Sequence, residues 1–134
     1  MIITLDVSAG IEFIMGRKNQ LFIKSKLVKA DWIIAPTLFI SEASNVMWKY
    51  HSLKNYPESK LMKRLRRLLD IIDQFVETKD IYEEAILVSF KINHPVYDAM
   101  YLVTARRKNA KLLTMDNRLI KAANKIEIPV YNIN

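Results

Sequence analysis

Brief apolar runs alternate with longer amphipathic segments along this chain of 134 residues. Short apolar runs predict strands, whereas apolar residues spaced three or four positions apart predict helices. The expected strands cover 2–5, 32–35, 75–76, 112–114 and, as a last edge strand, 128–133. The expected helices cover 7–15, 21–28, 38–50, 58–72, 81–92, 96–108 and 117–125. This alternation is typical of a mostly parallel sheet with helices on both faces.

The composition fits one ordinary globular domain over residues 1–134, with 51% hydrophobic and 26% charged residues and no internal repeat or linker. Because there is no cysteine, disulfides, thiolate metal sites and cysteine nucleophiles are excluded, and two histidines argue against a histidine-rich metal site. No apolar run is long enough to span a bilayer, and the first residues lack the basic region of a signal peptide. We therefore expect a soluble cytoplasmic protein without a membrane partner.

Four acidic residues stand where expected strands end or in expected helices. Asp6 and Asp116 each follow a strand, and in open parallel sheets ligands bind beyond the carboxyl ends of the strands. Glu42 and Asp98 lie among apolar residues in helices that look largely buried, where an unpaired carboxylate is costly. Four carboxylates in one cleft repel one another unless a cation neutralises them, and oxygen-only ligands suit magnesium or manganese.

Each of these acids also has a structural interpretation. Asp6 and Asp116 stand where helices begin, so either one equally fits an N-cap. Glu42 or Asp98 would instead need a salt bridge, for which the basic candidates are Arg106 and Arg118. The spacing of these residues leaves both interpretations open.

Smaller polar residues flank the acids. Ser8 and Thr114 either orient a metal-bound water or a phosphate, or simply form turns. Asn45 and Asn117 are candidates for supporting the acids from a neighbouring position.

Two aromatic residues and two histidines receive structural interpretations. Tyr97 and Tyr101, four positions apart, are expected to pack together on one helix face. His51 and His94 are expected to be surface or turn residues.

Three stretches carry the acids in an order and spacing that resembles a known family. ITLDVSAGIEFIM contains Asp6 and Ser8, APTLFISEASNVMWK contains Glu42 and Asn45, and PVYDAMYLVTARRKNAKLLTMDNRL contains Asp98 and Asp116. Together they resemble the PIN domain family, and in particular the small toxin ribonucleases of VapBC toxin and antitoxin pairs. The resemblance implies a three-layer α/β/α fold with a mostly parallel central sheet of about five strands.

The resemblance also implies an activity and partners. Asp6, Glu42, Asp98 and Asp116 would be the catalytic residues that hold Mg²⁺ or Mn²⁺ in an endoribonuclease. The protein would be the toxin of a toxin–antitoxin system, with RNA as substrate, a cognate antitoxin and a homodimeric state. The alternative is a PIN-like module that binds RNA or protein without cutting.

Positive charge dominates the chain, with a net charge of +7 and a pI of 9.6, which favours polyanionic partners. One basic group crowds the polar face of the helix at 58–72 and fits either a solvated face or an RNA contact; its members are Lys60, Lys63, Arg64, Arg66 and Arg67. A second group follows Asp98 and is the favoured substrate contact; its members are Arg106, Arg107, Lys108 and Lys111.

Overall fold

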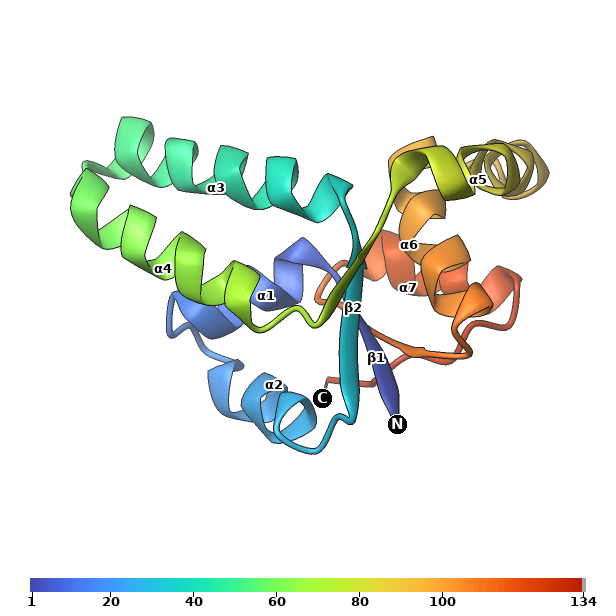
Figure 1. The fold of residues 1–134 in the computed structure, drawn as a ribbon, viewed down its shortest axis with the longest axis horizontal. Coiled ribbons are helices and arrows are strands. Elements are labelled where there is room, and N and C mark those ends of the chain that lie inside the picture. Colours follow the sequence, from blue (N-terminus) through green and yellow to red (C-terminus); the bar gives the residue numbers. More distant parts are fainter. Residues whose placement is uncertain (134) are drawn as a thin grey trace.

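The computed structural model describes residues 1–133 and contains a parallel sheet of four strands in the order β3-β2-β1-β4. The strands are β1 (Ile2–Leu5), β2 (Trp32–Pro36), β3 (Gln74–Val76) and β4 (Lys111–Leu113). In register, Ile3 of β1 lies opposite Ile33 of β2 on one side and Lys111 of β4 on the other. All carboxyl ends of the strands therefore meet at one edge, which is the upper edge in Figure 1.

The described residues form seven helices, of which the first six connect the strands and the seventh follows β4. They are α1 (Val7–Ile14), α2 (Gln20–Leu27), α3 (Leu38–Lys54), α4 (Glu58–Asp70), α5 (Thr78–Ile92), α6 (Val96–Arg107) and α7 (Asn117–Lys125). Figure 1 shows α1 to α4 on one side of the strands and α5 to α7 on the other. The predicted α/β architecture with helices on both faces is therefore confirmed. None of the helices in residues 1–133 combines the length and the apolar character needed to cross a bilayer.

The expected fifth strand is reduced to a single bridge. Val130 pairs in parallel with Leu112, and Leu112 also donates to the carbonyl of Pro129 and accepts from the amide of Tyr131. Proline has no amide hydrogen to donate, so Pro129 limits how far this segment joins the sheet. The prediction of about five strands was one strand too high for the described residues.

Buried side chains recur along the strands and helices. Ile3 and Leu5 of β1 are fully buried, Trp32 at the start of β2 is 44% exposed, and α6 is buried along the whole stretch from Ala99 to Ala105. On α3, buried residues recur at Phe39, Ala43 and Met47, so that helix keeps an exposed face. Ile40 is 37% exposed because it lies one position, about 100°, away from that buried stripe.

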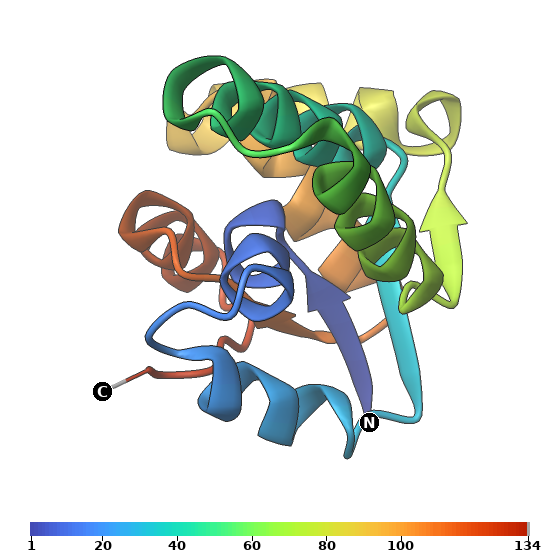
Figure 2. The same cartoon turned by 90° about the vertical axis from the view of Figure 1, so that its left-hand side faces the viewer.

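A glycine allows α1 to approach its neighbours closely. A Cβ added at Gly10 would lie 3.0 Å from Cδ1 of Leu68 and 3.2 Å from Cζ of Phe39. In Figure 2, α1 lies in front of β1, with α3 and α4 above it. The close packing of α1 against α3 and α4 therefore depends on a residue without a side chain.

A left-handed turn ends the first long helix. Asn55 adopts the left-handed conformation, with φ of 56°, and its amide donates to the carbonyl of His51. Asparagine tolerates this conformation, and it ends α3 before α4 begins at Glu58.

Candidate active site

Asp6 lies directly after β1 and is 8% exposed. Its Oδ2 atom accepts hydrogen bonds from the backbone amide of Ser8 at 3.3 Å, from Ser8 Oγ at 2.5 Å and from Thr114 Oγ1 at 2.7 Å. The amide contact makes Asp6 the N-cap of α1, as one interpretation of the sequence predicted. The hydroxyl contacts hold the carboxylate at the carboxyl edge of the sheet.

The same two hydroxyl groups join the start of α1 to the loop after β4. Ser8 Oγ accepts from the amide of Met115 at 2.9 Å, and Thr114 Oγ1 accepts from the amide of Asp116 at 3.0 Å. Asp116 in turn caps α7. The prediction that Asp6 and Asp116 meet at one edge is therefore supported by a continuous hydrogen-bond chain.

Glu42 comes to this edge from α3 and is held by a buried tyrosine. The hydroxyl of Tyr101, on α6, donates to Glu42 Oε1 at 2.6 Å, and Tyr101 is 2% exposed. Burial raises the pKa of Tyr101, and the nearby charges of Asp6 and Glu42 raise it further. The phenol therefore remains protonated and acts as a fixed donor to the carboxylate.

Asp98 lies in the first turn of α6, where two basic groups approach it. Its Oδ2 atom is 3.8 Å from an Nη of Arg118 and 4.0 Å from Nδ1 of His94. Of the two predicted salt-bridge partners, Arg118 is therefore the one beside Asp98, whereas Arg106 pairs elsewhere.

The acids influence one another's protonation. Burial raises the pKa of Asp6, against the hydrogen bonds of Ser8 and Thr114, and the charge of Asp116 adds to the rise. Burial also raises the pKa of Glu42, with Tyr101 opposing and the charges of Asp6 and Asp98 reinforcing the shift. This mutual effect indicates that the carboxylates share one region of negative potential.

Asp98 belongs to the same electrostatic group. Burial raises its pKa, the charge of Asp116 raises it further, and Arg118 and His94 oppose the rise.

A family model described as PIN domain matches residues 3–125, which include every one of these side chains. The chain belongs to the PIN domain family.

Solved structures show the same fold. PAE2754 from Pyrobaculum aerophilum is 19% identical, with a TM-score of 0.75 over 97% of this chain and 83% of that one. FitAcB from Neisseria gonorrhoeae is 15% identical, with a TM-score of 0.65 over 97% and 96%. A domain of a functionally unknown protein from Methanocaldococcus jannaschii is 23% identical, with a TM-score of 0.54 over 99% and 91%. The comparison with curated proteins finds no match.

The donor set of this PIN domain suits a hard divalent cation. The hydrogen bonds and ion contacts of Asp6, Glu42, Asp98 and Asp116 involve only one oxygen of each carboxylate within residues 1–133. The second oxygen of each is left for another partner. No three histidine, aspartate or glutamate side chains of the described residues converge on one point that would hold a metal. Magnesium needs no such triad, because it usually takes one or two carboxylates and keeps several waters.

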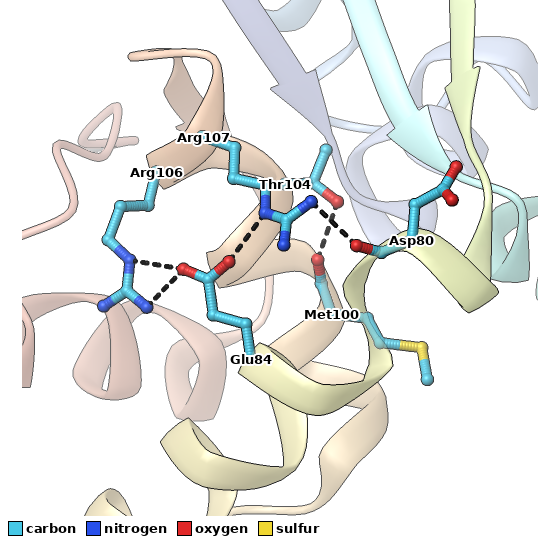
Figure 3. A network of polar contacts seen from close by, with 6 residues as sticks. All are labelled: Asp80, Glu84, Met100, Thr104, Arg106 and Arg107. Atoms are coloured by element: carbon cyan, nitrogen blue, oxygen red, sulfur yellow. Dashed lines mark hydrogen bonds and ion pairs between the residues drawn. The ribbon is translucent and has the colours of Figure 1, made fainter.

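The predicted substrate arginines lie at the other end of α6 from Asp98. Arg106 and Arg107 bind opposite oxygens of Glu84 on α5, each with a shortest distance of 2.6 Å, and Arg107 also donates to the carbonyl of Asp80 at 2.7 Å (Figure 3). These guanidinium groups join α5 to α6, and their predicted substrate contact stays a prediction.

Asn45 and Asn117 are both exposed, and within residues 1–133 neither side chain has a hydrogen bond to the four carboxylates. Asn45 stands one turn after Glu42, and Asn117 begins α7. A supporting role for either residue stays a prediction.

One pairing predicted near the acids was wrong. Tyr97 is 59% exposed while Tyr101 is buried, so the expected packing pair does not form. His94 lies in the connection between α5 and α6, in keeping with the predicted turn, and its side chain is only 13% exposed and faces Asp98.

Proposed function

We propose that this PIN domain is a Mg²⁺- or Mn²⁺-dependent endoribonuclease. The supporting observation is that four carboxylates affect one another's pKa. Asp6, Glu42, Asp98 and Asp116 come from separate elements and reach the same edge of the sheet. Burial and like charge together make these acids a favourable place for a cation and an unfavourable place for a further negative charge. RNA is preferred to DNA because of the resemblance to the short toxins.

In this proposal each residue has a defined task. Asp6, Glu42 and Asp98 hold one or two ions, directly or through water, with the oxygens that lack protein partners, and Asp116 completes the negative potential. Tyr101, Ser8 and Thr114 hold the carboxylates in place through their hydroxyl groups. A divalent ion bound there would lower the pKa of a water molecule and balance charge on the scissile phosphate. No protein nucleophile is needed.

The direct test is cleavage of RNA by the purified protein with magnesium or manganese. Asp6→Asn and Asp98→Asn should each abolish the activity, since both remove ligand charge at nearly constant shape. Asp70→Asn is the matched control, because Asp70 is exposed at the end of α4. Undiminished cleavage by both site variants would contradict the proposal.

A PIN module that binds without cutting is the second candidate. It is favoured by the absence of a preformed three-acid cluster among residues 1–133. Calorimetry with manganese separates the two candidates, because no heat of binding at millimolar metal would favour the non-catalytic module.

We further propose a toxin role in the cytoplasm, with a cognate antitoxin. An apolar hollow of about 400 Å³ between α3 and α4 supports a protein partner, and Trp48 beside it is 60% exposed. The hollow is lined mainly by apolar side chains, among them Met47, Leu61 and Leu65, so the expected antitoxin segment is an amphipathic helix. Co-purification with the product of an adjacent short reading frame, and its loss in Trp48→Glu, would test this pairing.

A homodimer is the last element of the proposal. Tyr82, Ile86 and Phe90 form an exposed apolar stripe at every fourth residue of α5, and Leu87 beside it is 65% exposed. Such a stripe suits a second copy of the same helix. Sedimentation should give a dimer that Phe90→Glu converts to monomer, while Leu21→Glu, at another exposed apolar position on α2, should leave it dimeric.

A further inference from the structure

A second like-charged group lies at the far end of α3. Arg17, Lys49 and Lys54 line an open pocket of about 240 Å³, together with Val46, Tyr50 and Leu53. Its three charged side chains are all cationic, in contrast to the acids at the start of the same helix.

Tyr50 holds two of these cations. An Nη of Arg17 donates to the Tyr50 hydroxyl at 3.1 Å, and Nζ of Lys54 lies 5.0 Å from the centre of the Tyr50 ring. The ring is 9% exposed and packs edge-on against Tyr56, with centroids 5.2 Å apart. A neutral, rigid side chain therefore positions two positive charges near each other.

These cations are only partly neutralised by the protein. Glu12 approaches Arg17 at 3.5 Å, but the same carboxylate also accepts two hydrogen bonds from Asn19. Within residues 1–133, neither Lys49 nor Lys54 has an ion-pair partner. Three positive charges face one shared carboxylate, so the pocket attracts an anion.

The pocket lies on a direct line from the acids. On α3, Glu42, Val46, Lys49 and Leu53 follow one face, and the seven positions from Glu42 to Lys49 rise about 10 Å. The first helix, α1, begins after Asp6, packs against α3 and leads to the loop that carries Arg17. Figure 1 shows α1 and α3 leaving the strands on the same side of the sheet.

We propose that this pocket binds a backbone phosphate of the RNA strand, a few nucleotides from the phosphate that is cleaved. The inference rests on the proposed ribonuclease function and specifies where the strand leaves the site. Lys49 and Lys54 contact the phosphate, Arg17 supports it from the opposite wall, and the exposed side chain of Leu53 contacts the adjoining base.

The binding test uses a single-stranded RNA of about twelve nucleotides, a length in the range of single-strand binding sites. It is done in chelator with the Asp98→Asn protein, so that cleavage does not interfere. Lys49→Ala/Lys54→Ala should weaken binding about tenfold at moderate salt and reduce the slope of log K against log salt by about 0.7, the value for one lost phosphate contact on a single strand. Lys24→Ala/Lys29→Ala, at exposed positions in α2 and just after it, removes the same net charge and should leave both quantities nearly unchanged.

Equal effects of the two double variants would overturn the proposal, since they would show only a loss of overall charge. It would also be overturned if the pocket variant lost binding to a polyglutamate peptide but kept full RNA affinity, because the pocket would then serve an acidic protein. Thermal unfolding of each variant shows whether the fold is retained.

Substrate length provides a second measurement in the active protein. Lys49→Ala/Lys54→Ala should lower kcat/KM for the long RNA and leave kcat/KM for a trinucleotide unchanged, since a trinucleotide is too short to reach the pocket. Equal losses on both substrates would overturn the proposal. If no RNA is cleaved at all, the ribonuclease function fails, and the binding test still decides the pocket.

Discussion

The acidic side chains near the two ends of α6 have pKa values shifted in opposite directions. At the first turn, Asp98 lies among other acids and its pKa is raised by burial and by Asp116. At the last turn, burial raises the pKa of Glu84, but Arg106 and Arg107 outweigh it and leave that pKa below its ordinary value. Charges balanced within the protein join helices, whereas charges left unbalanced indicate a place for an external partner.

The strongest test of this contrast exchanges one acid at each end. Asp98→Asn should reduce RNA cleavage on the order of 100-fold or more while leaving stability equal or higher, because it removes a repelled charge. Glu84→Gln should leave cleavage within about twofold and cost about 1 kcal/mol of unfolding free energy, the size expected for an ion pair that is partly exposed. Cleavage rates and urea unfolding of both variants measure this, and similar profiles would refute the contrast.

A smaller effect is expected from the hydroxyl that holds Glu42. Tyr101→Phe should weaken manganese binding about tenfold, as loss of a group that orients a metal ligand usually does. Tyr97→Phe is the control, since Tyr97 is on the same helix but exposed. Titration calorimetry gives both affinities, and unchanged affinity in Tyr101→Phe would mean that Glu42 needs no fixed donor.

The smallest expected effect is the pH dependence of the Glu84 contribution. Because the folded pKa of Glu84 lies below its ordinary value of 4.5, its stabilising effect is complete above that value and is lost as pH falls through the folded pKa. Wild type and Glu84→Gln should therefore differ in unfolding free energy at neutral pH and converge in acid. A difference that grew on acidification would have the wrong sign for an arginine-paired carboxylate.

The local pattern of apolar and polar residues predicted most of the fold. The helix over 117–125 has its expected bounds, and the other helices and strands differ from prediction by no more than four residues at either end. Periodicity, caps and turn residues are local, so the sequence carries them directly. The prediction of the last edge strand was wrong because the pairing of this segment depends on Pro129. Its missing amide hydrogen matters only once the neighbouring strand, β4, is known.

The candidate site shows more clearly which contacts the sequence alone does not predict. The four acids were predicted as a group, yet their metal role remains a proposal. Nearness of Arg106 and Arg107 to Asp98 in sequence suggested a shared role, but eight or nine helical residues separate them by about 12 Å, and Glu84 from another helix engages both. Long-range partners such as Tyr101 for Glu42 depend on how helices cross, which periodicity does not specify.

The hydrogen bond from Thr114 to Asp6 also has a consequence during synthesis of the chain on the ribosome. It joins residues 108 positions apart, and β1 gains its β4 neighbour only when residues 111–113 exist. A ribosome must therefore complete more than four fifths of the chain before Asp6 can be held in place. Every shorter nascent chain lacks this arrangement.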